Sequence, residues 1–588
     1  MLSYSLCRQL CQGSVRKAIR LTGCDRKHLS DSKVDGQTRQ DGTTGKKETS
    51  GSSSLDDTGK EDSGDDFRYE QMFTAERPKF SFAERDAMWY KYRKRVASIV
   101  DDFQEDSYQR GWRYPQMADH FIEIRLQDPH AKVTMRDILT SRNQLPKNIL
   151  ETKARRSIDP AILEQTIDVV VIGAGIMGLS AAHALKMAGK EAINVLVVDR
   201  DLNFTHASTT LSLGCIRQQF SHPLNIAMAQ AGARYFRKAK DNLSFIGVEP
   251  LDLQYHPQGF LILVEEDRAE RFFEYHKKQT ELGAFVELLS PQMLEQKYPW
   301  LDLDGVVLGS IGLQDEGWIN PYPLLAGLKG KCEFLGVQFV EGEVFDFNTR
   351  FYKESAGMRD ENGDLKESCH HALVRLPHDR IYQLDFTRCF VCAGAENAAL
   401  AKRLGIGMGQ GMRKIPYPVV PKKRYVYVIN APNAPVLDFP ILVDTSGVIC
   451  RREGLGGNYI VTKVPTPEEE PDPGNLDVDY SYYYNVIHPL LSNRVAGFDN
   501  AKIVSAWAGY CDENVWDGSP ILGNHPYYDN IWWMGGFSSH GMQMAGPAAT
   551  TLANGVLRGV YEEEFIDLTM FSWMRLFANE RVVEELNF

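Results

Sequence analysis

A buried-strand pattern that runs into closely spaced glycines constrains this chain more than any other feature. Residues 169–172 are four consecutive β-branched side chains, which predict a strand covered on both faces. Gly173, Gly175 and Gly178 follow with the spacing G-x-G-x-x-G, and residues 180–190 are rich in helix formers. In a dinucleotide site, the first glycine permits the turn and the second lets the backbone approach the pyrophosphate. The third lets the helix pack closely on the strand.

Two other interpretations of this segment are weaker. Residues 169–185 carry no formal charge, which touches the lower limit for a membrane-spanning helix, but such a helix has no need of a β-branched run breaking into glycines. The glycines could also serve packing alone in an ordinary βαβ unit. Residues 194–198 predict a second buried strand, however, and it ends in Asp199, where an acidic side chain would meet a ribose. The order of these features predicts a dinucleotide site.

Composition narrows the class of partner. The chain has 588 residues and a formal net charge of −12, which argues against nucleic acid as an electrostatic partner. Its ten cysteines form no paired C-x-x-C set, so we expect no metal site. Cys389 and Cys392 form one C-x-x-C within a predicted strand, where positions three apart point to opposite faces. We therefore expect buried structural thiols there.

The first part of the chain predicts a targeting segment and a linker. Residues 1–27 begin with Arg8, Arg16, Lys17 and Arg20 and have no acid before Asp25, which is typical of a mitochondrial presequence for the matrix. An ordinary basic terminus is the alternative. Residues 28–66 are almost wholly polar and charged, and a segment of this kind cannot offset its ordering entropy by apolar burial. We expect it to be disordered.

Residues 67–164 form an N-terminal extension with one clear element. Trp89, Tyr92, Val96, Ile99 and Phe103 recur at three and four residues, the spacing of one face of an amphipathic helix. This face would pack on the main domain and leave the basic residues solvated. Alternatively, the helix would dock on a partner or on an anionic membrane surface, such as the inner mitochondrial membrane.

The main domain, residues 165–588, is predicted to interleave two folds. Strand–glycine–helix patterns occur in segments of about 165–245, 310–410 and 505–576, and strand-rich segments of about 246–309 and 411–504 lie between them. This interleaving does not suit a contiguous NAD domain but suits a flavoprotein. We predict an α/β fold: an FAD-binding Rossmann-like domain of the glutathione-reductase type, interleaved with a mixed β-sheet substrate or cap domain.

Motifs along residues 168–576 resemble the D-amino-acid oxidase and sarcosine oxidase/dehydrogenase family of FAD enzymes. They include "STTLSLGCIRQQFS" from residue 208, "LQDEGWINPYPLL" from residue 313 and "GGFSSHGMQMA" from residue 535. Others, such as "EEEPDPGNLDVD" from residue 468, are similar to a mitochondrial branch of the family that assists assembly of respiratory complex I. The resemblance implies complex I subunits or assembly intermediates as partners, with peripheral association with the inner membrane.

The resemblance also implies which residues hold FAD. They come from distant segments and are, in chain order, Gly173, Gly175, Ile176, Met177, Gly178, Asp199, Arg200, Ser208, Thr209, Arg217, Val344, Ala393, Gly394, Gly509, Gly536, Phe537, Gly541, Met542 and Gln543. The three glycines at 173–178, with Asp199 and Arg200, would hold the adenosine end, and Val344 would contact the adenine side through its backbone. Ala393 and Gly394 would cross the diphosphate, and Ser208, Thr209 and Arg217 would line the path toward the flavin. Residues 536–543 would surround the isoalloxazine ring. There, backbone N–H groups would face the negative charge that a reduced flavin gathers.

Two departures from the family pattern bear on chemistry. The histidine and the cysteine through which relatives attach FAD are not matched: His206 lies too early, and Cys511 lies about three positions after the family position, Ala508. We therefore expect FAD to be non-covalent. In sarcosine oxidases a lysine that grips the substrate carboxylate stands where this chain has Gln543, and a neutral amide lacks charge-assisted strength.

Two functions remain open at this stage. One is an active dehydrogenase or oxidase that transfers hydride from a C–N carbon of an amine or amino-acid-like substrate to flavin N5. Its candidate catalytic residues are Gln543, Arg217, Tyr425, Arg451 and His540. The other is a flavin-binding assembly factor for complex I, and the glutamine at position 543 favours it.

Overall fold

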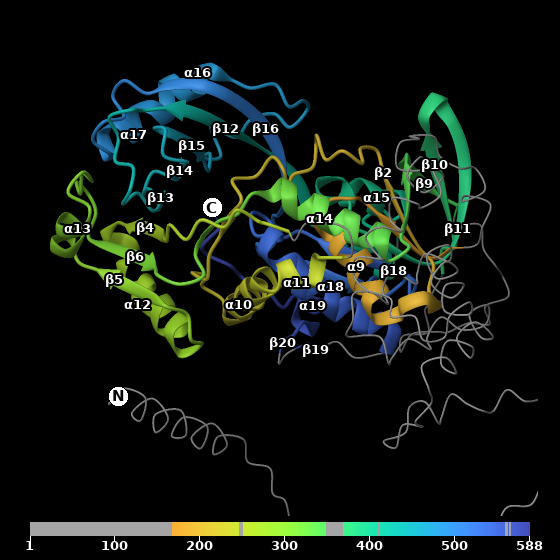
Figure 1. Cartoon of the computed structure of the whole chain (residues 1–588). Helices are drawn as coiled ribbons and strands as arrows, with labels where there is room; N and C mark the ends of the chain where they lie inside the picture. Colours follow the sequence, from red (N-terminus) through yellow and green to blue (C-terminus); the bar gives the residue numbers. More distant parts are fainter. Residues whose placement is uncertain are drawn as a thin grey trace, which may run out of the picture. The chain divides into compact units, whose positions relative to one another are not determined.

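The computed structural model describes residues 167–245, 251–348, 368–409, 411–558, 562–563 and 566–587. The predicted presequence, linker and amphipathic extension, residues 1–27, 28–66 and 67–164, lie outside these ranges. Figure 1 shows two large sheets in the described part of the chain. None of the helices described combines the length and hydrophobicity needed to span a bilayer.

The first sheet is a parallel nucleotide-binding sheet built from distant segments. Its central strand pairs in parallel on both sides, and one antiparallel strand closes one edge. The order is β17 (Ile521–Asn524), β18 (Ile531–Gly535), β11 (Arg380–Val391), β1 (Ile167–Ile172), β2 (Val195–Asp199) and β8 (Gln338–Glu341). Residues more than 200 positions apart therefore lie side by side, which confirms the predicted interleaving.

Both faces of this sheet are buried. Helices α9 (Ile176–Gly189), α10 (Pro223–Arg237), α14 (Pro321–Phe334) and α18 (Gly541–Arg558) pack on one face. Strands β9 (Glu343–Phe347) and β10 (His371–Leu376) and helix α15 (Asn397–Arg403) cover the other. Alternate residues of β1 enter the two cores, as a strand covered on both faces requires. Cys392 and Cys389 likewise enter opposite cores, as predicted.

The second sheet, which we call the cap sheet, is mixed. Its strands are antiparallel except for one parallel pair, β13 with β4. The order is β16 (Lys502–Asn514), β12 (Val419–Asn430), β15 (Asn458–Lys463), β14 (Val448–Glu453), β13 (Ile441–Val443), β4 (Phe260–Val264), β6 (Leu308–Gly312) and β5 (Val286–Leu289). Helix α12 (Glu266–Glu281) packs on one of its faces, which we call the inner face.

The cap strands run past the predicted segment boundaries. Strand β6 continues to Gly312 and β16 continues to Asn514, whereas the predicted cap segments stop near 309 and 504. Strand β4 lies within the predicted cap segment of about 246–309, and strands β8 and β9 lie within the predicted nucleotide-binding segment of about 310–410. β16 pairs with β12 of the cap sheet along its whole length, and its C-terminal end, at Asp512, also contacts the segment that leads into α18.

Candidate functional site

The turn between β1 and α9 has the geometry that its glycines predict. Gly173 has a φ of +105°, and a Cβ there would lie 2.4 Å from the carbonyl oxygen of Cys392. A Cβ on Gly178 would lie 1.8 Å from the carbonyl oxygen of Gly173. Gly175 differs, because its φ is −69° and a Cβ on it would meet no atom within 4 Å. Two glycines therefore serve the turn and the packing, while the third borders open space at the N-terminus of α9.

A second glycine turn lies against the first. Cys392 donates its N–H to the carbonyl oxygen of Ile172 at 2.8 Å, and Ala393 donates to Oδ1 of Asn397 at 2.7 Å. Gly394 has a φ of +54° and, like Gly175, faces open space. A helix N-terminus presents unpaired N–H groups and a positive dipole end to an anion. The two turns together form a cradle of the kind that a pyrophosphate requires.

Asp199 is tied to the first turn at the carboxyl end of β2. Its carboxylate accepts hydrogen bonds from the N–H groups of Ala174 and Asp201, and burial raises its pKa. The structure thus holds this acid where the ribose of an adenine nucleotide would lie. Arg200 is exposed and lies 3.6 Å from Glu396 of the second turn.

The turn before α18 is fixed by a buried carboxylate. Asp512 of β16 accepts from the N–H of Gly536 at 2.7 Å and of Phe537 at 3.4 Å. Its backbone carbonyl accepts from Ser538, whose φ is +54°. Burial raises the pKa of Asp512 to about 6. The sequence did not single out Asp512, because its partners lie 24 residues away and no local pattern announces the contact.

The N-termini of α9 and α18 converge. A Cβ on Gly541 would lie 2.6 Å from Cε of Met177, so a side chain at 541 would push the end of the Met177 side chain aside. Met542 follows half-buried in the first turn of α18, and Ile176 is buried in the first turn of α9. The N–H of Ile176 donates to Oγ1 of Thr209 at 3.4 Å. Predicted FAD contacts from three distant segments, at residues 176–177, 209 and 541–542, therefore lie close together.

Gln543 and Arg217 lie together, as the resemblance implies. Oε1 of Gln543 accepts from the backbone N–H of Arg217 at 2.8 Å. Its Nε2 is buried and has no hydrogen-bond partner in the described part of the chain. The guanidinium of Arg217 donates to the carbonyl oxygens of Gln219 and Leu586 and lies 4.4 Å from the ring centre of Phe220. Burial lowers the pKa of Arg217 to about 10.

Of the other candidate catalytic residues, two are buried and the third lies on the outer face of the cap sheet. His540 Nε2 lies 2.7 Å from Oδ1 of Asn587, and burial, aided by the charge of Arg217, lowers its pKa to about 3. Arg451 faces inward, with Nε donating to the carbonyl of Leu213 at 2.8 Å. Tyr425 packs with the cluster on the outer face of the cap sheet, so the structure does not bring it together with the others.

The remaining predicted contacts are placed as follows. Ser208 is exposed beside Thr209. Val344 is buried in β9. A Cβ on Gly509 would lie 3.0 Å from Cβ of Leu211, so this glycine serves the contact between β16 and the segment that leads to Arg217.

Neither candidate for covalent attachment has a favourable setting. Cys511 Sγ lies 4.0 Å from Oγ of Ser539, and burial raises the pKa of the thiol to about 12. A thiol with so high a pKa is a weak nucleophile, because the thiolate is the reactive form. His206 is exposed, and its backbone N–H donates to Asp201. These positions agree with the expectation of non-covalent FAD.

Two buried carboxylates near Arg217 were missed from the sequence. Glu316 accepts from the N–H of Gln218 and from Nε2 of Gln219, each at 2.8 Å, and burial raises its pKa to about 7. Glu584 accepts from Ser221 and from other groups at the start of α10. Their partners lie tens to hundreds of residues away. Glu316 follows Asp315 and Glu584 precedes Glu585 in the chain, so the neighbouring sequence does not mark either acid as buried.

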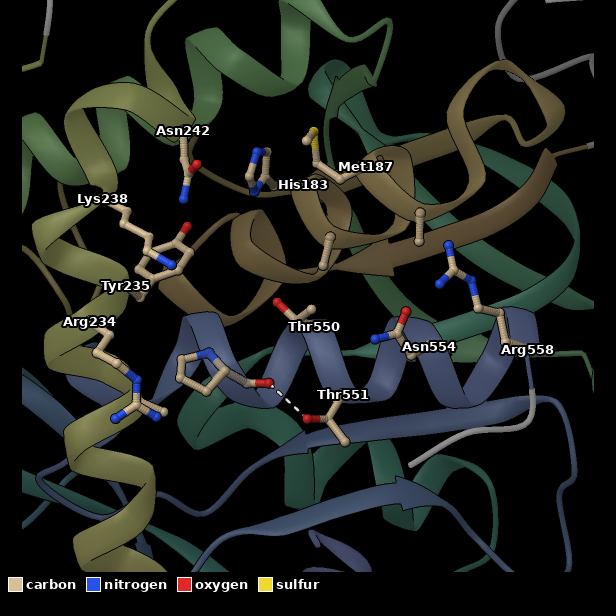
Figure 2. Close-up of a pocket in the computed structure, with 14 residues that line it drawn as sticks. His183, Met187, Arg234, Tyr235, Lys238, Asn242, Thr550, Thr551, Asn554 and Arg558 are labelled. Atoms are coloured by element: carbon tan, nitrogen blue, oxygen red, sulfur yellow. Dashed lines mark hydrogen bonds between the residues drawn. The ribbon is translucent and has the colours of Figure 1, made fainter. Parts of the chain in front are cut away.

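A cavity of about 340 Å³ elsewhere on the molecule is not part of this site. It is lined by residues of the middle and C-terminal parts of α9 and α18 and by the facing side of α10. Figure 2 shows Arg234 and Lys238 on one side of it and Arg558 on the other. No residue of the two glycine turns or of the turn before α18 lines it.

In the described ranges of the chain, no group of three His, Cys, Asp or Glu side chains could hold a metal ion.

Comparison with known proteins agrees with this geometry. Residues 168–554 match the family model described as FAD dependent oxidoreductase. The chain belongs to this family. It is 41% identical over 424 residues to FAD-dependent oxidoreductase domain-containing protein 1 of Bos taurus, covering 71% of this chain and 86% of the bovine protein. It is 34% identical over 436 residues to the homolog in Drosophila melanogaster, with 74% and 83% covered.

Solved structures share the fold. L-proline dehydrogenase from P. horikoshii superposes with a TM-score of 0.57 at 18% identity, covering 71% of this chain and 99% of that one. Glycine oxidase from Geobacillus kaustophilus superposes with a TM-score of 0.55 at 19% identity, covering 69% and 98%. At these identities the likeness establishes the fold and leaves the substrate open.

The residues present fit FAD, the cofactor of this family. Gly175 and Gly394 leave open the space that a pyrophosphate would fill. The N-termini of α9 and α18 converge on it, and Nε2 of Gln543 is a buried donor with no described partner. When bound, FAD supplies hydride chemistry. The chain's own contribution is to hold the two turns and to place the neutral His540 and the charged Arg217 beside the turn at 536–543.

Proposed function

We propose that this FAD-dependent oxidoreductase fold serves assembly and stability of respiratory complex I in the mitochondrial matrix. Its partners would be complex I subunits or assembly intermediates, and it would associate peripherally with the inner membrane. The basic, acid-free start of the sequence supports the compartment. The 41% identity to the bovine relative, and the motifs shared with the mitochondrial branch of the family, support the branch.

One structural observation favours the assembly role over turnover. Three of the polar side chains that could grip a substrate, Arg217, Arg451 and His540, are bonded within the protein. Arg217 donates to two backbone carbonyls, Arg451 donates to Leu213, and His540 is bonded to Asn587. A substrate that needed these groups would first have to replace an internal partner.

FAD would then act mainly as a structural ligand. The turns around Gly175, Gly394 and Gly536 come from three segments of the chain, and one molecule bridging them would stabilise the native state by mass action. Losing the cofactor would remove a partner-binding surface by loosening these segments. The assembly role therefore predicts a need for bound FAD without a need for substrate oxidation.

The experiment is a rescue of complex I assembly in cells that lack this protein. Gln543→Ala removes a side-chain amide but spares the backbone of the turn, so we expect it to restore mature complex I on a native gel. Gly175→Asp places a carboxylate in the pyrophosphate space, so we expect it to fail. Each amount is normalised to the abundance of the variant. Failure of Gln543→Ala at normal flavin content and abundance would mean that turnover is required.

The second candidate function is oxidation of a C–N bond in an amine or amino-acid-like substrate. The buried Nε2 of Gln543, which lacks a described partner, favours it, because an unpaired buried donor is costly unless a ligand satisfies it. An anaerobic screen of amines and amino acids would detect a substrate by loss of the visible flavin absorbance. Bleaching that Gln543→Ala abolishes would establish this activity.

A further inference from the structure

Residues 582–587, which we call the strap, form an extended segment with alternating burial. Val582, Glu584 and Leu586 are buried, with relative exposures of 2%, 4% and 0%, while Val583 and Glu585 are exposed. A period of two is the pattern of an extended chain with one covered face. The strap is nevertheless not paired in either large sheet. Its position is therefore set mainly by side-chain contacts, together with one backbone hydrogen bond from the N–H of Glu584 to the carbonyl of Asp517 at 3.2 Å.

The first half of the strap is anchored in the nucleotide-binding part. The carboxylate of Glu584 accepts from the N–H and hydroxyl of Ser221, from the N–H of His222 and from Nδ2 of Asn225. Burial alone would raise the pKa of Glu584, but these hydrogen bonds outweigh it and lower the pKa. The N–H of Val582 donates to Asp517 at 3.1 Å. Buried, charge-assisted bonds of this kind are strong.

The next residue fastens the strap to the cap. Glu585 accepts from the hydroxyl of Tyr275 at 2.7 Å and from Nη1 of Arg271 at 3.1 Å. Both partners lie on α12. The side chains of Arg271 and Glu585 are 67% and 43% exposed, and an exposed ion pair contributes little. This fastening, which we call the latch, is therefore weaker than the anchor at Glu584.

The last two residues fill the space between the cap and the turn at 536–543. Leu586 packs in the apolar cluster of the inner face, with residues of β4, β13 and α12. Its carbonyl oxygen accepts from the guanidinium of Arg217, whose backbone N–H is bonded to Gln543. Asn587 meets the ring of His540. The anchor at Glu584, the latch at Glu585 and the space-filling residues Leu586 and Asn587 thus follow one another in chain order.

From this arrangement we propose that the strap is a gate. While the latch at Glu585 is made, Leu586 and Asn587 close the cap side of the turn at residues 536–543. Breaking the latch releases the side chain of Glu585 from α12, and Leu586 and Asn587 can then swing away from the cap while Glu584 and the backbone N–H of Glu585, which donates to Oγ of Ser221 at 2.9 Å, stay bonded. The swing also breaks the bond from the N–H of Leu586 to the carboxylate of Glu584 and the bond from the Asn587 amide to the carbonyl of Glu584. The movement removes the Leu586 carbonyl from Arg217 and the Asn587 amide from His540. The gate depends on FAD binding but is independent of any role in complex I assembly.

The test measures how fast a small nucleophile reaches the flavin. Sulfite adds through sulfur to N5 of oxidised flavin, and the reaction is followed by loss of visible absorbance in the full-length FAD-bound protein. Glu585→Gln removes the charge of the latch and Tyr275→Phe removes its hydroxyl. We expect each to raise the second-order rate by up to about tenfold, the effect of losing one exposed bond of this type. Glu274→Gln, on the exposed side of the same helix, is the matched control and leaves the rate unchanged.

Hydrogen exchange of a peptide covering residues 582–587 gives a second measurement that needs no reaction at the flavin. In the latch variants, exchange at Leu586 and Asn587 should speed up, while exchange at Val582 and Glu585, whose N–H groups donate to Asp517 and Ser221, does not. Equal sulfite rates in wild type, control and latch variants would overturn the proposal. If Glu585→Gln released flavin, Tyr275→Phe would decide, since it removes a single oxygen. Unchanged exchange in Tyr275→Phe together with an unchanged sulfite rate would also count against the gate.

Discussion

Replacing Gly175 with aspartate puts a carboxylate into the open space at the N-terminus of α9 without straining the protein. The backbone of Gly175 is extended, with φ −69° and ψ −174°, and it occupies the N-cap position with no side-chain cap. A Cβ there meets nothing within 4 Å, and aspartate is a favoured N-cap residue. We therefore expect the FAD-free variant to unfold at a temperature close to that of the FAD-free wild type.

The expected loss of FAD binding follows from charge. A carboxylate about 4 Å from one pyrophosphate charge, at an effective dielectric constant of about 20, is repelled by about 4 kcal/mol. This weakens affinity by roughly a thousandfold, since about 1.4 kcal/mol corresponds to tenfold. Wild type with FAD at about a hundred times its dissociation constant gains about 2.7 kcal/mol. The variant at the same FAD concentration gains almost nothing.

The assay is thermal unfolding of flavin-stripped protein with increasing FAD. An unfolding entropy of about 2 cal/mol/K per residue over some 420 residues converts 2.7 kcal/mol to a rise of about 3 °C in Tm. We expect that rise in wild type and none in Gly175→Asp. Gly175→Asn is the isosteric neutral control and should keep part of the rise. If Gly175→Asp responds to FAD as wild type does, the pyrophosphate does not lie at this turn and our assignment of the cradle is refuted.

Three further predictions concern stability and attachment. Because burial raises the pKa of Glu316 to about 7, the folded state holds a proton there that the unfolded state loses near pH 4.5. The free energy of unfolding should therefore fall as pH rises from about 4.5 to 7, by up to about 1.4 kcal/mol per unit, and urea titrations of Glu316→Gln should lack this component. Arg575 and Asp517 form a buried pair at 3.0 Å, so Arg575→Ala should cost about 3–5 kcal/mol in the same titrations, and a loss below about 1 kcal/mol would contradict the pairing. Acid precipitation should release yellow flavin into the supernatant, because the half-buried Cys511 thiol has a raised pKa; colour retained in the pellet would show a covalent bond.

The first βαβ unit could be predicted because all its signals are local. The β-branched run, the glycine spacing and the acid at 199 lie within about thirty residues, and each has a steric or electrostatic reason to stand where it does. The glycines of the turn at residues 536–543 are a local signal of the same kind. The conformation of that turn also depends on Asp512, which lies 24 residues before Gly536.

Contacts between distant segments could not be predicted in this way. A strand pattern shows that Tyr425 alternates with its neighbours but not which face of the sheet points inward, and the structure places it on the outer face. Asp512 and Glu584 depend on partners 24 and more than 350 residues away. Nothing in the neighbouring sequence distinguishes these acids from solvated ones.

The order of strands in the nucleotide-binding sheet has a consequence for synthesis. Its central strand β1 lies between β2 and β11, and β11 in turn pairs with β18, which begins at residue 531. At about 5–20 residues per second, the ribosome needs roughly 10–45 s to go from the end of β1 to the end of β11. During that time β1 exposes an apolar edge with no neighbour on one side, so a chaperone has a defined window in which to shield it. The cofactor can be loaded only after translation has passed the turn at residues 536–543, which makes flavin uptake a late checkpoint for a finished chain.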